Sequence, residues 1–163
     1  MPAVSVGPRL FVAGHDPERD GRLVYRGRVG AAVAVGDTAA ALRLATQNAL
    51  TSARAATGSL GRLRCVVLAV FVSTATPEAL DPTLLEESLA LVGTVLSSKD
   101  RPAVWLRPAQ GLAGGMPVEV ELVLEARGRP ARQRLTRGRW AGRPGRRGPA
   151  AGRAPRRSGG RTS

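Results

Sequence analysis

Two segments of the chain carry apolar residues at the spacing of one helix face. The first follows Asp37, a residue type that favours a helix N-terminus, and continues up to Gly58, with Gly58 or Gly61 as the expected helix end. In the second, leucines and valines recur between Pro82 and Ser97, and proline is common in the first turn of a helix. We therefore expect two amphipathic helices.

Five shorter segments are predicted as strands because they are rich in apolar, β-branched or aromatic residues. Residues 10–13 and 22–25 are separated by turn-forming residues and predict a hairpin. Residues 63–72 are almost continuously apolar, as in a strand that is buried on both faces. Residues 103–106 and 118–124 complete the set, and the valines and leucines of the last segment alternate onto one face.

The predicted order of elements is β-β-α-β-α-β-β. Because this order combines hairpins with helical crossovers, it indicates an α+β fold with a mixed sheet and both helices on one face. The opposite face of the sheet then has no cover within the chain. We expect copies of the protein to associate through it.

Charge divides the 163-residue chain into two parts. The net charge is +13, a value typical of nucleic-acid-binding proteins. Residues 127–163 contain 13 arginines and no acidic residue, which leaves 12 basic and 12 acidic residues in 1–126. We expect a folded domain at 1–126. The arginine-, glycine- and proline-rich remainder cannot bury enough apolar surface to fold, so we expect a disordered tail at 127–163.

Composition also disfavours several kinds of chemistry. The single cysteine, Cys65, lies in an apolar run and is expected to be a buried core residue. One histidine and one cysteine cannot build the usual tetrahedral zinc site, so we expect no metal and no cofactor. The chain has no apolar stretch long enough for a membrane span, and its N-terminus has no signal-peptide pattern. These features predict a cytoplasmic protein without membrane contacts.

Several short sequences within this framework resemble the Rid family, also called YjgF or L-PSP. They follow the order of the family and extend over most of the predicted domain. No single piece is specific, but six pieces in order, on a matching string of elements, together carry the resemblance. The pieces are Gly21–Gly30, Gln47–Leu50, Gly58–Arg64, Val70–Val72, Arg101–Val104 and Pro117–Glu121.

The resemblance implies a chorismate-mutase-like homotrimer with a pocket for a small carboxylate-bearing metabolite at each subunit interface. In that family an arginine on the penultimate strand holds the carboxylate and a glutamate on the last strand positions water, and Arg101 and Glu119 occupy these positions here. The implied reaction is hydrolysis of 2-imino or 2-enamino acids to 2-keto acids and ammonia. Gly27 would let a ligand approach the backbone, and the adjacent Arg26 is a further ligand-binding candidate.

Two positions depart from the pattern of the active deaminases. Arg26 stands where a small hydroxyl residue is usual, and Ala103 stands where cysteine or serine is common. A noncatalytic regulatory protein that binds a metabolite is therefore the main alternative. RNA binding or endoribonuclease activity is a third interpretation, with nucleic acid contacted only through the basic tail at 127–163. On the plainest interpretation, Arg101 and Glu119 are solvated surface charges.

Overall fold

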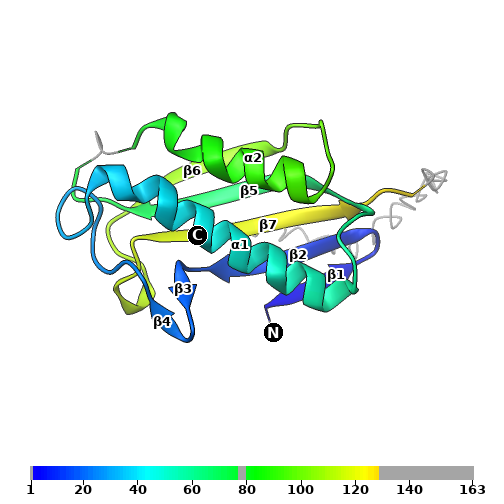
Figure 1. The fold of residues 1–163 in the computed structure, drawn as a ribbon, viewed down its shortest axis with the longest axis horizontal. Coiled ribbons are helices and arrows are strands. Elements are labelled where there is room, and N and C mark those ends of the chain that lie inside the picture. Colours follow the sequence, from blue (N-terminus) through cyan, green and yellow to red (C-terminus); the bar gives the residue numbers. More distant parts are fainter. Residues whose placement is uncertain (1, 77–79, 129–163) are drawn as a thin grey trace, which may run out of the picture. The chain divides into compact units, whose positions relative to one another are not determined.

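Residues 2–76 and 80–128 are described by the computed structural model, and their longer strands form one five-stranded sheet beside two helices (Figure 1). In space the strands follow the order β1-β2-β7-β5-β6. β5 and β6 are parallel and the other neighbouring pairs are antiparallel, so the sheet is mixed, as predicted. The bounds are Ala3–Val6 for β1, Arg9–His15 for β2, Leu63–Ser73 for β5, Ala103–Ala109 for β6 and Val118–Ala126 for β7.

Both helices lie on the same face of the sheet, with α1 packed on β2 and β7 and α2 packed beside α1 (Figure 1). α1 (Thr38–Thr57) ends at Gly58, whose φ of 74° is a left-handed conformation that glycine adopts at little cost. α2 (Glu86–Val95) continues the 3-10 turn η3 (Pro82–Leu85), and the Asp81 side chain caps that turn by accepting a backbone hydrogen bond of 2.8 Å. Two further 3-10 turns are η1 (Val35–Asp37) and η4 (Ala113–Gly115).

The core lies between the helices and one face of the sheet. Alternation along β7 directs one set of its side chains at α1, and these are at most 1% exposed, as predicted for this strand: Val118, Val120, Leu122 and Leu124. Four of the eight buried residues of α1 are alanines, which let the helix approach the sheet closely. Cys65 on β5 belongs to this core, and burial raises the pKa of its thiol to about 12.

The predicted hairpin between residues 10–13 and 22–25 is wrong. β2 pairs on one side with β1, through a turn at Gly7, and on the other side with β7. The sequence of β1 is short and mostly exposed, so it gives a weak strand pattern. Because β1 supplies the strand that residues 22–25 do not, the predicted order of elements in the sheet still holds.

The second half of the predicted hairpin forms a small ribbon of its own. Glu18–Arg19 (β3) pairs only with Arg22–Leu23 (β4), in a two-stranded sheet separate from the main one. Asp20 and Gly21 between them have φ angles of 53° and 75°, as tight hairpin turns require. The turn-forming residues were therefore predicted in the right place, but the tight turn at Asp20 and Gly21 joins β3 to β4.

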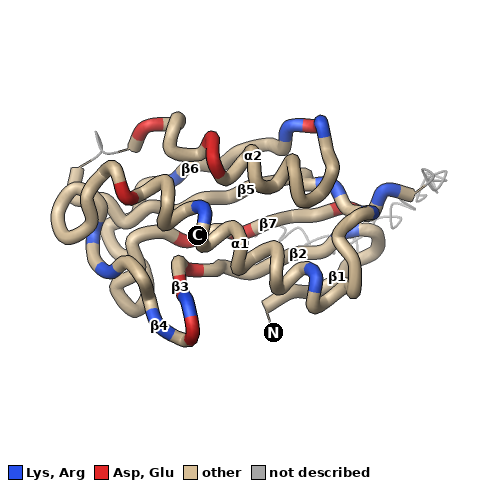
Figure 2. Tube along the Cα trace, viewed as in Figure 1, with Lys and Arg blue, Asp and Glu red and all other residues tan. Residues whose placement is uncertain are grey.

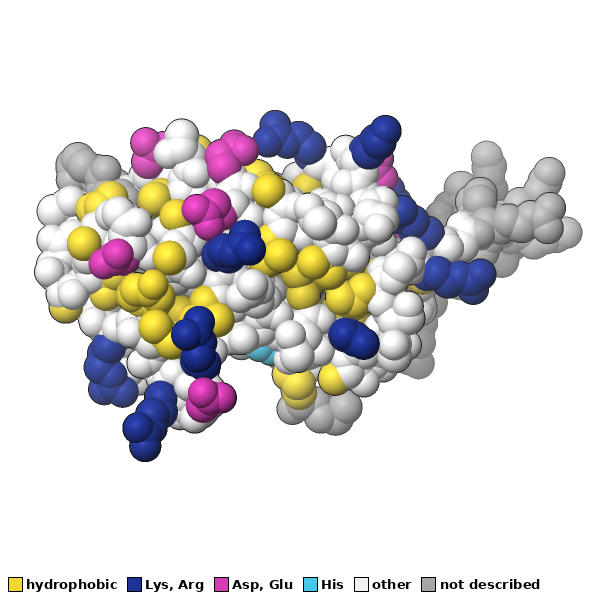
Figure 3. Space-filling model, in the orientation of Figure 1, with side chains coloured by type: hydrophobic (Ala, Val, Ile, Leu, Met, Phe, Trp, Pro, Cys, Tyr) yellow, Lys and Arg dark blue, Asp and Glu magenta, His cyan; other side chains and the backbone are white. Residues whose placement is uncertain are grey.

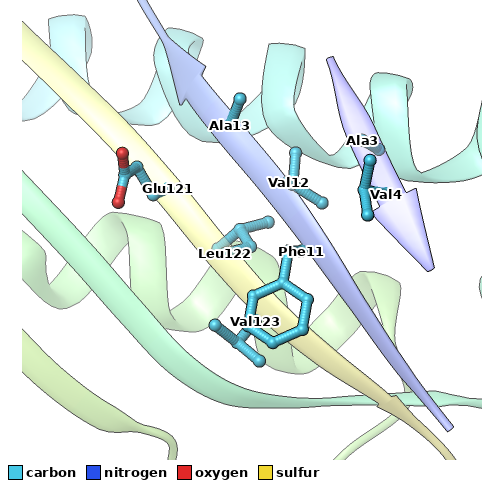
Figure 4. A pocket seen from close by; sticks show the side chains of 8 residues that line it. All are labelled: Ala3, Val4, Phe11, Val12, Ala13, Glu121, Leu122 and Val123. Carbon is cyan, nitrogen blue, oxygen red and sulfur yellow. The ribbon is translucent and has the colours of Figure 1, made fainter. Parts of the chain in front are cut away.

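The sheet face opposite α1 and α2, here called the open face, carries large apolar side chains that remain half exposed. Val4 is 50%, Phe11 42% and Trp105 53% exposed. Val4, Phe11 and Val123 on this face help to line a pocket of about 280 Å³, and Figure 4 shows their side chains. Exposed apolar surface of this kind is typical of protein contact surfaces.

The surface of the described ranges is otherwise mixed in character. Residues of both charges are interspersed over the helices and strands (Figure 2). On the helix side, apolar side chains are exposed between charged ones (Figure 3). None of the helices in residues 2–76 and 80–128 has both the length and the hydrophobicity needed to cross a membrane. Most of the predicted tail, residues 129–163, lies outside the described residues.

The core described above predicts a large difference between two valine-to-alanine substitutions. Val70 on β5 is fully buried, whereas Val24 is 46% exposed. Val70→Ala removes two buried methyl groups and leaves a cavity, so it should lower the free energy of unfolding by about 2–3 kcal/mol. Val24→Ala, the matched control, should change it by less than about 0.5 kcal/mol in urea denaturation. Equal losses would contradict this placement of the core.

Candidate functional site

Glu119 lies on β7 with its side chain on the open face, opposite Phe71 of β5. On its other side the carboxylate lies directly over Gly14 of β2, because a Cβ on Gly14 would be only 1.6 Å from Glu119 Oε1. No residue other than glycine leaves room for the carboxylate in this position. Gly14 is thus a site residue that the sequence analysis did not identify.

The surroundings of Glu119 favour its protonated form. Partial burial is the main cause that raises the pKa of this carboxyl, and the nearby carboxylates of Glu121 and Asp16 raise it further, while His15 lowers it. A carboxylate with a raised pKa is a stronger base than an ordinary surface glutamate and accepts a proton more readily. Perturbed carboxyls of this kind are enriched at functional sites.

His15 links the sheet to the helix layer. Its Nδ1 donates a hydrogen bond of 2.6 Å to the carbonyl of Ala13, and its Nε2 lies 2.6 Å from the hydroxyl of Ser52 on α1. In the neutral ring with a proton on Nδ1, Nε2 accepts the hydroxyl proton of Ser52. Both ring nitrogens are therefore engaged. Within the described ranges, His, Cys, Asp and Glu side chains form no group of three that could hold a metal ion.

Arg26 and Gly27 lie at the end of the sheet where β5 and β6 finish. The N–H of Gly27 donates a 2.7 Å hydrogen bond to the carbonyl of Gly115, and its φ of 105° suits glycine. Arg26 is exposed next to the same turn. The following segment is anchored by Arg28, whose guanidinium Nε donates a 3.1 Å hydrogen bond to the carbonyl of Thr74, just after β5.

Arg101 lies in the loop before β6, and 77% of its side chain is exposed. Its guanidinium is 3.8 Å from the carboxylate of Glu86, an exposed ion pair of small energetic weight. Together with apolar side chains of α2 and β6, including Leu89 and Val104, these two residues line a groove of about 490 Å³. The groove is on the helix side of β6.

One chain does not bring Arg101 and Glu119 together. Glu119 is level with Phe71 of β5, and Phe71 is paired on its other side with Arg107 of β6. Arg101 precedes Arg107 by six positions, so it is displaced by about 20 Å along the strand direction. Arg26 and Gly27 lie towards the Glu119 end of the sheet, and Arg101 lies at the opposite end. A pocket with both Arg101 and Glu119 would need residues from two copies.

Arg107 is a second residue that the sequence analysis missed. The predicted strand ended at residue 106, whereas β6 extends to Ala109. Paired residues of neighbouring strands project on the same face of a sheet, so Arg107, Phe71 and Glu119 form a row across the open face. The extended alternation of β6 would have revealed this position if the strand had been predicted at full length.

Several solved structures resemble this chain. Protein Atu1372 from Agrobacterium tumefaciens, of unknown function, is 29% identical with a TM-score of 0.71, over 77% of this chain and 80% of that one. A "putative endoribonuclease" from Shewanella oneidensis is 26% identical with a TM-score of 0.70, over 77% of this chain and 83% of that one. The YjgF gene product of E. coli, at 18% identity and a TM-score of 0.53 over 78% of this chain and 87% of that one, shares the fold.

The family comparison covers the larger part of the chain. A search of curated proteins finds no match. The family described as "YjgF/chorismate_mutase-like, putative endoribonuclease" matches residues 1–112. This match and the mixed sheet with two helices on one face confirm the resemblance and the fold class inferred from the sequence. The chain belongs to the YjgF/chorismate-mutase-like family.

Proposed function

We propose that the protein is a homotrimer in which the open faces of the copies meet and small-molecule pockets form between chains. The half-exposed apolar side chains of Val4, Phe11 and Trp105 support association through this face. Arg101 and Glu119 lie too far apart in one chain to share a pocket, so a pocket that contains both requires a second copy. Sedimentation that detects only monomers at micromolar concentration would contradict this assembly.

The reaction that we propose is hydrolysis of small 2-imino or 2-enamino acids. The observation that carries this proposal is the position of the Glu119 carboxyl group directly over Gly14, where its pKa is raised. Glu119 would orient a water molecule and accept one of its protons as the water oxygen bonds to the imine carbon. Glu119 passes this proton to the imine nitrogen, which gives a carbinolamine. The proton of the carbinolamine hydroxyl group then also reaches the nitrogen as the carbon–nitrogen bond breaks, and ammonia and the 2-keto acid leave. Arg101 of a neighbouring copy would hold the substrate carboxylate.

The class of ligand has a parallel in a protein of the same fold. TdcF from E. coli, which is 16% identical to this chain with a TM-score of 0.54, has been solved with bound serine. Serine is a small molecule with one carboxylate and one nitrogen on the adjacent carbon. At this identity the likeness concerns the fold, and the ligand class for this chain stays part of the proposal.

Two other functions compete with hydrolysis. A noncatalytic metabolite-binding role is favoured by Arg26 and Ala103, which depart from the deaminase pattern. RNA cleavage is named in the description of the family and of the Shewanella protein. The basic tail that would bind RNA lies almost entirely outside the described residues. Turnover of an imine distinguishes hydrolysis from both.

Glu119→Gln should reduce ammonia release from freshly generated 2-iminobutyrate by about 100-fold or more, because the amide cannot accept a proton from water. Glu121→Gln is the matched control, since Glu121 lies on the same face of β7 two residues away. It should retain most of the activity. If Glu119→Gln releases ammonia as fast as the wild type does, Glu119 takes no part in the reaction.

Glu119→Gln should also change stability in a pH-dependent way. Because the pKa of Glu119 is raised in the folded state, its protonated form contributes stability at pH values below the unfolded-state pKa. This contribution is lost as the pH rises through the folded-state pKa. The glutamine variant does not lose it. In urea denaturation the variant should therefore gain stability relative to wild type at pH 7, with a smaller gain at pH 4. A gain that is larger at pH 4 would contradict the direction of the shift.

Gly14→Ala should displace the Glu119 carboxylate from its seat and bring its pKa closer to that of an ordinary glutamate, because the carboxylate moves into water. Carboxyl-carbon NMR titration of Glu119 measures this directly. Gly36→Ala is the control, since a Cβ on Gly36 meets no atom within 4 Å. An unchanged titration in Gly14→Ala would show that the carboxylate does not depend on Gly14.

A further inference from the structure

β6 is an edge strand whose outer side has no partner among residues 2–76 and 80–128. It is the last strand in the sheet order β1-β2-β7-β5-β6, so only its inner side is paired, with β5 (Figure 1). The middle of this strand, Val104–Leu106, consists of large apolar residues. An apolar edge of this kind is a template for pairing with another strand.

Two observations determine which backbone groups of β6 point outward. The carbonyl of Ala109 accepts a 3.3 Å hydrogen bond from the N–H of Thr74, just after β5, so the backbone groups of Ala109 point inward. Alternate residues of a strand direct these groups to opposite sides, so those of Pro108, Leu106 and Val104 point outward. Pro108 agrees with this assignment, because a proline has no N–H and is tolerated where that side of a strand is unpaired. The edge therefore offers the N–H and C=O groups of Val104 and Leu106.

The side chains beside this edge are apolar on both faces of the sheet. On the helix side, Val104 and Leu106 line the groove of about 490 Å³, whose opposite wall includes Leu85 and Leu89. On the open face, Trp105 is 53% exposed. A strand added to the edge would fill the groove on one face and contact Trp105 on the other.

We infer that β6 of a second copy of this chain occupies the edge, antiparallel to the first and related to it by a two-fold axis at Trp105. A two-fold contact needs a self-complementary surface, and residues 102–108, Pro-Ala-Val-Trp-Leu-Arg-Pro, are nearly symmetrical about Trp105. Val104 then lies opposite Leu106 of the second copy, where each N–H meets a carbonyl. Pro102 lies opposite Pro108, so the residues that lack an N–H face each other at the ends of the paired segment.

The same register brings compatible side chains together. The two Trp105 residues lie directly opposite each other at a position without hydrogen bonds, where Cα atoms are about 4.5 Å apart and aromatic pairs stabilise antiparallel strands. Arg107 lies diagonally beside Trp105 of the second copy, and its guanidinium can stack on that ring. The two Arg107 residues are roughly 13 Å apart along the strands, so like charges do not meet. Val104 and Leu106 of both copies fill the groove.

Edge pairing goes beyond the open-face association of the proposed function. It uses the outer side of β6 and leaves Val4, Phe11 and Glu119 uncovered on the open face. Neither contact requires the other, and both together would join two trimers. An extended segment of an unrelated protein is the other occupant that this edge could take, and it predicts no self-association through β6.

Sedimentation of the full chain at micromolar concentration tests for the second copy. We expect two copies if edge pairing acts alone and six copies if it joins two trimers. A wild type that sediments as one copy or as three copies would overturn edge pairing, and three copies would still support the proposed trimer. Two copies would support edge pairing and contradict the trimer, so the two proposals can fail separately.

Disulfide cross-linking tests the register. Trp105→Cys places two thiols at the two-fold axis, at a separation that a disulfide spans, so oxidation should give a covalent dimer on a non-reducing gel. Ala103→Cys is the matched control, because this exposed residue lies on the same face and its two copies would be roughly 13 Å apart. It should not cross-link, and the buried Cys65 should stay reduced in both variants. Equally fast cross-linking of Ala103→Cys would contradict a two-fold axis at Trp105.

A mixture of two variants keeps the tryptophan in place. Ala103→Cys mixed with Arg107→Cys should give cross-linked heterodimers, since residues 103 and 107 lie opposite each other in the inferred register. Each variant alone should remain uncross-linked. The mixture decides the question if the loss of the tryptophan in Trp105→Cys weakens association. Absence of cross-links both in Trp105→Cys and in the mixture would overturn edge pairing.

Discussion

The two helices of this protein cover only one face of its sheet, and the rest of the structure follows from that one-sided packing. β5 shows the consequence in consecutive residues, since Val70 is buried against the helix layer while Phe71 projects from the open face. Within residues 2–76 and 80–128, the first set of side chains completes a core and no element covers the second. The open face therefore carries exposed apolar side chains together with Glu119 and Arg107.

Glu119 is held in a place that does not suit a carboxylate. It is partly desolvated and lies near Glu121 and Asp16, and both circumstances oppose its ionisation. The fold accommodates it because Gly14 has no side chain. Residues that lower stability in this way are expected where function, and not packing, determines the residue type. The same logic applies to Arg107, a charge on a face otherwise suited to association.

The sequence predicted those parts of the fold whose pattern is local. The alternation of β7, the apolar run of β5 and the helical spacing of α1 each reflect burial of one element on its neighbours. The N-terminal pairing could not be predicted in this way, because the long-range partner of β2 is β7, near the other end of the domain. A local turn signal therefore suggested residues 22–25 instead.

The sequence predicted the candidate site only in part, because some of its contacts join distant parts of the chain. Alternation was enough to place Glu119 away from the core, and the position of Arg101 before β6 was expected. Gly14 could not be recognised, because its contact with Glu119 crosses strands beside a register shift between Val12 and His15. Gly27 has the backbone conformation of a glycine, but its N–H is occupied by Gly115.

The pairing of Leu10 with Leu124 has a consequence for how the protein is made. During synthesis the β1–β2 hairpin emerges long before β7, so β2 must wait for almost the whole domain before its permanent neighbour appears. Contacts between such distant parts of a chain slow folding, and an unpaired strand edge invites pairing with other chains in the meantime. Nascent chains of this protein are thus most prone to aggregation before β7 has left the ribosome.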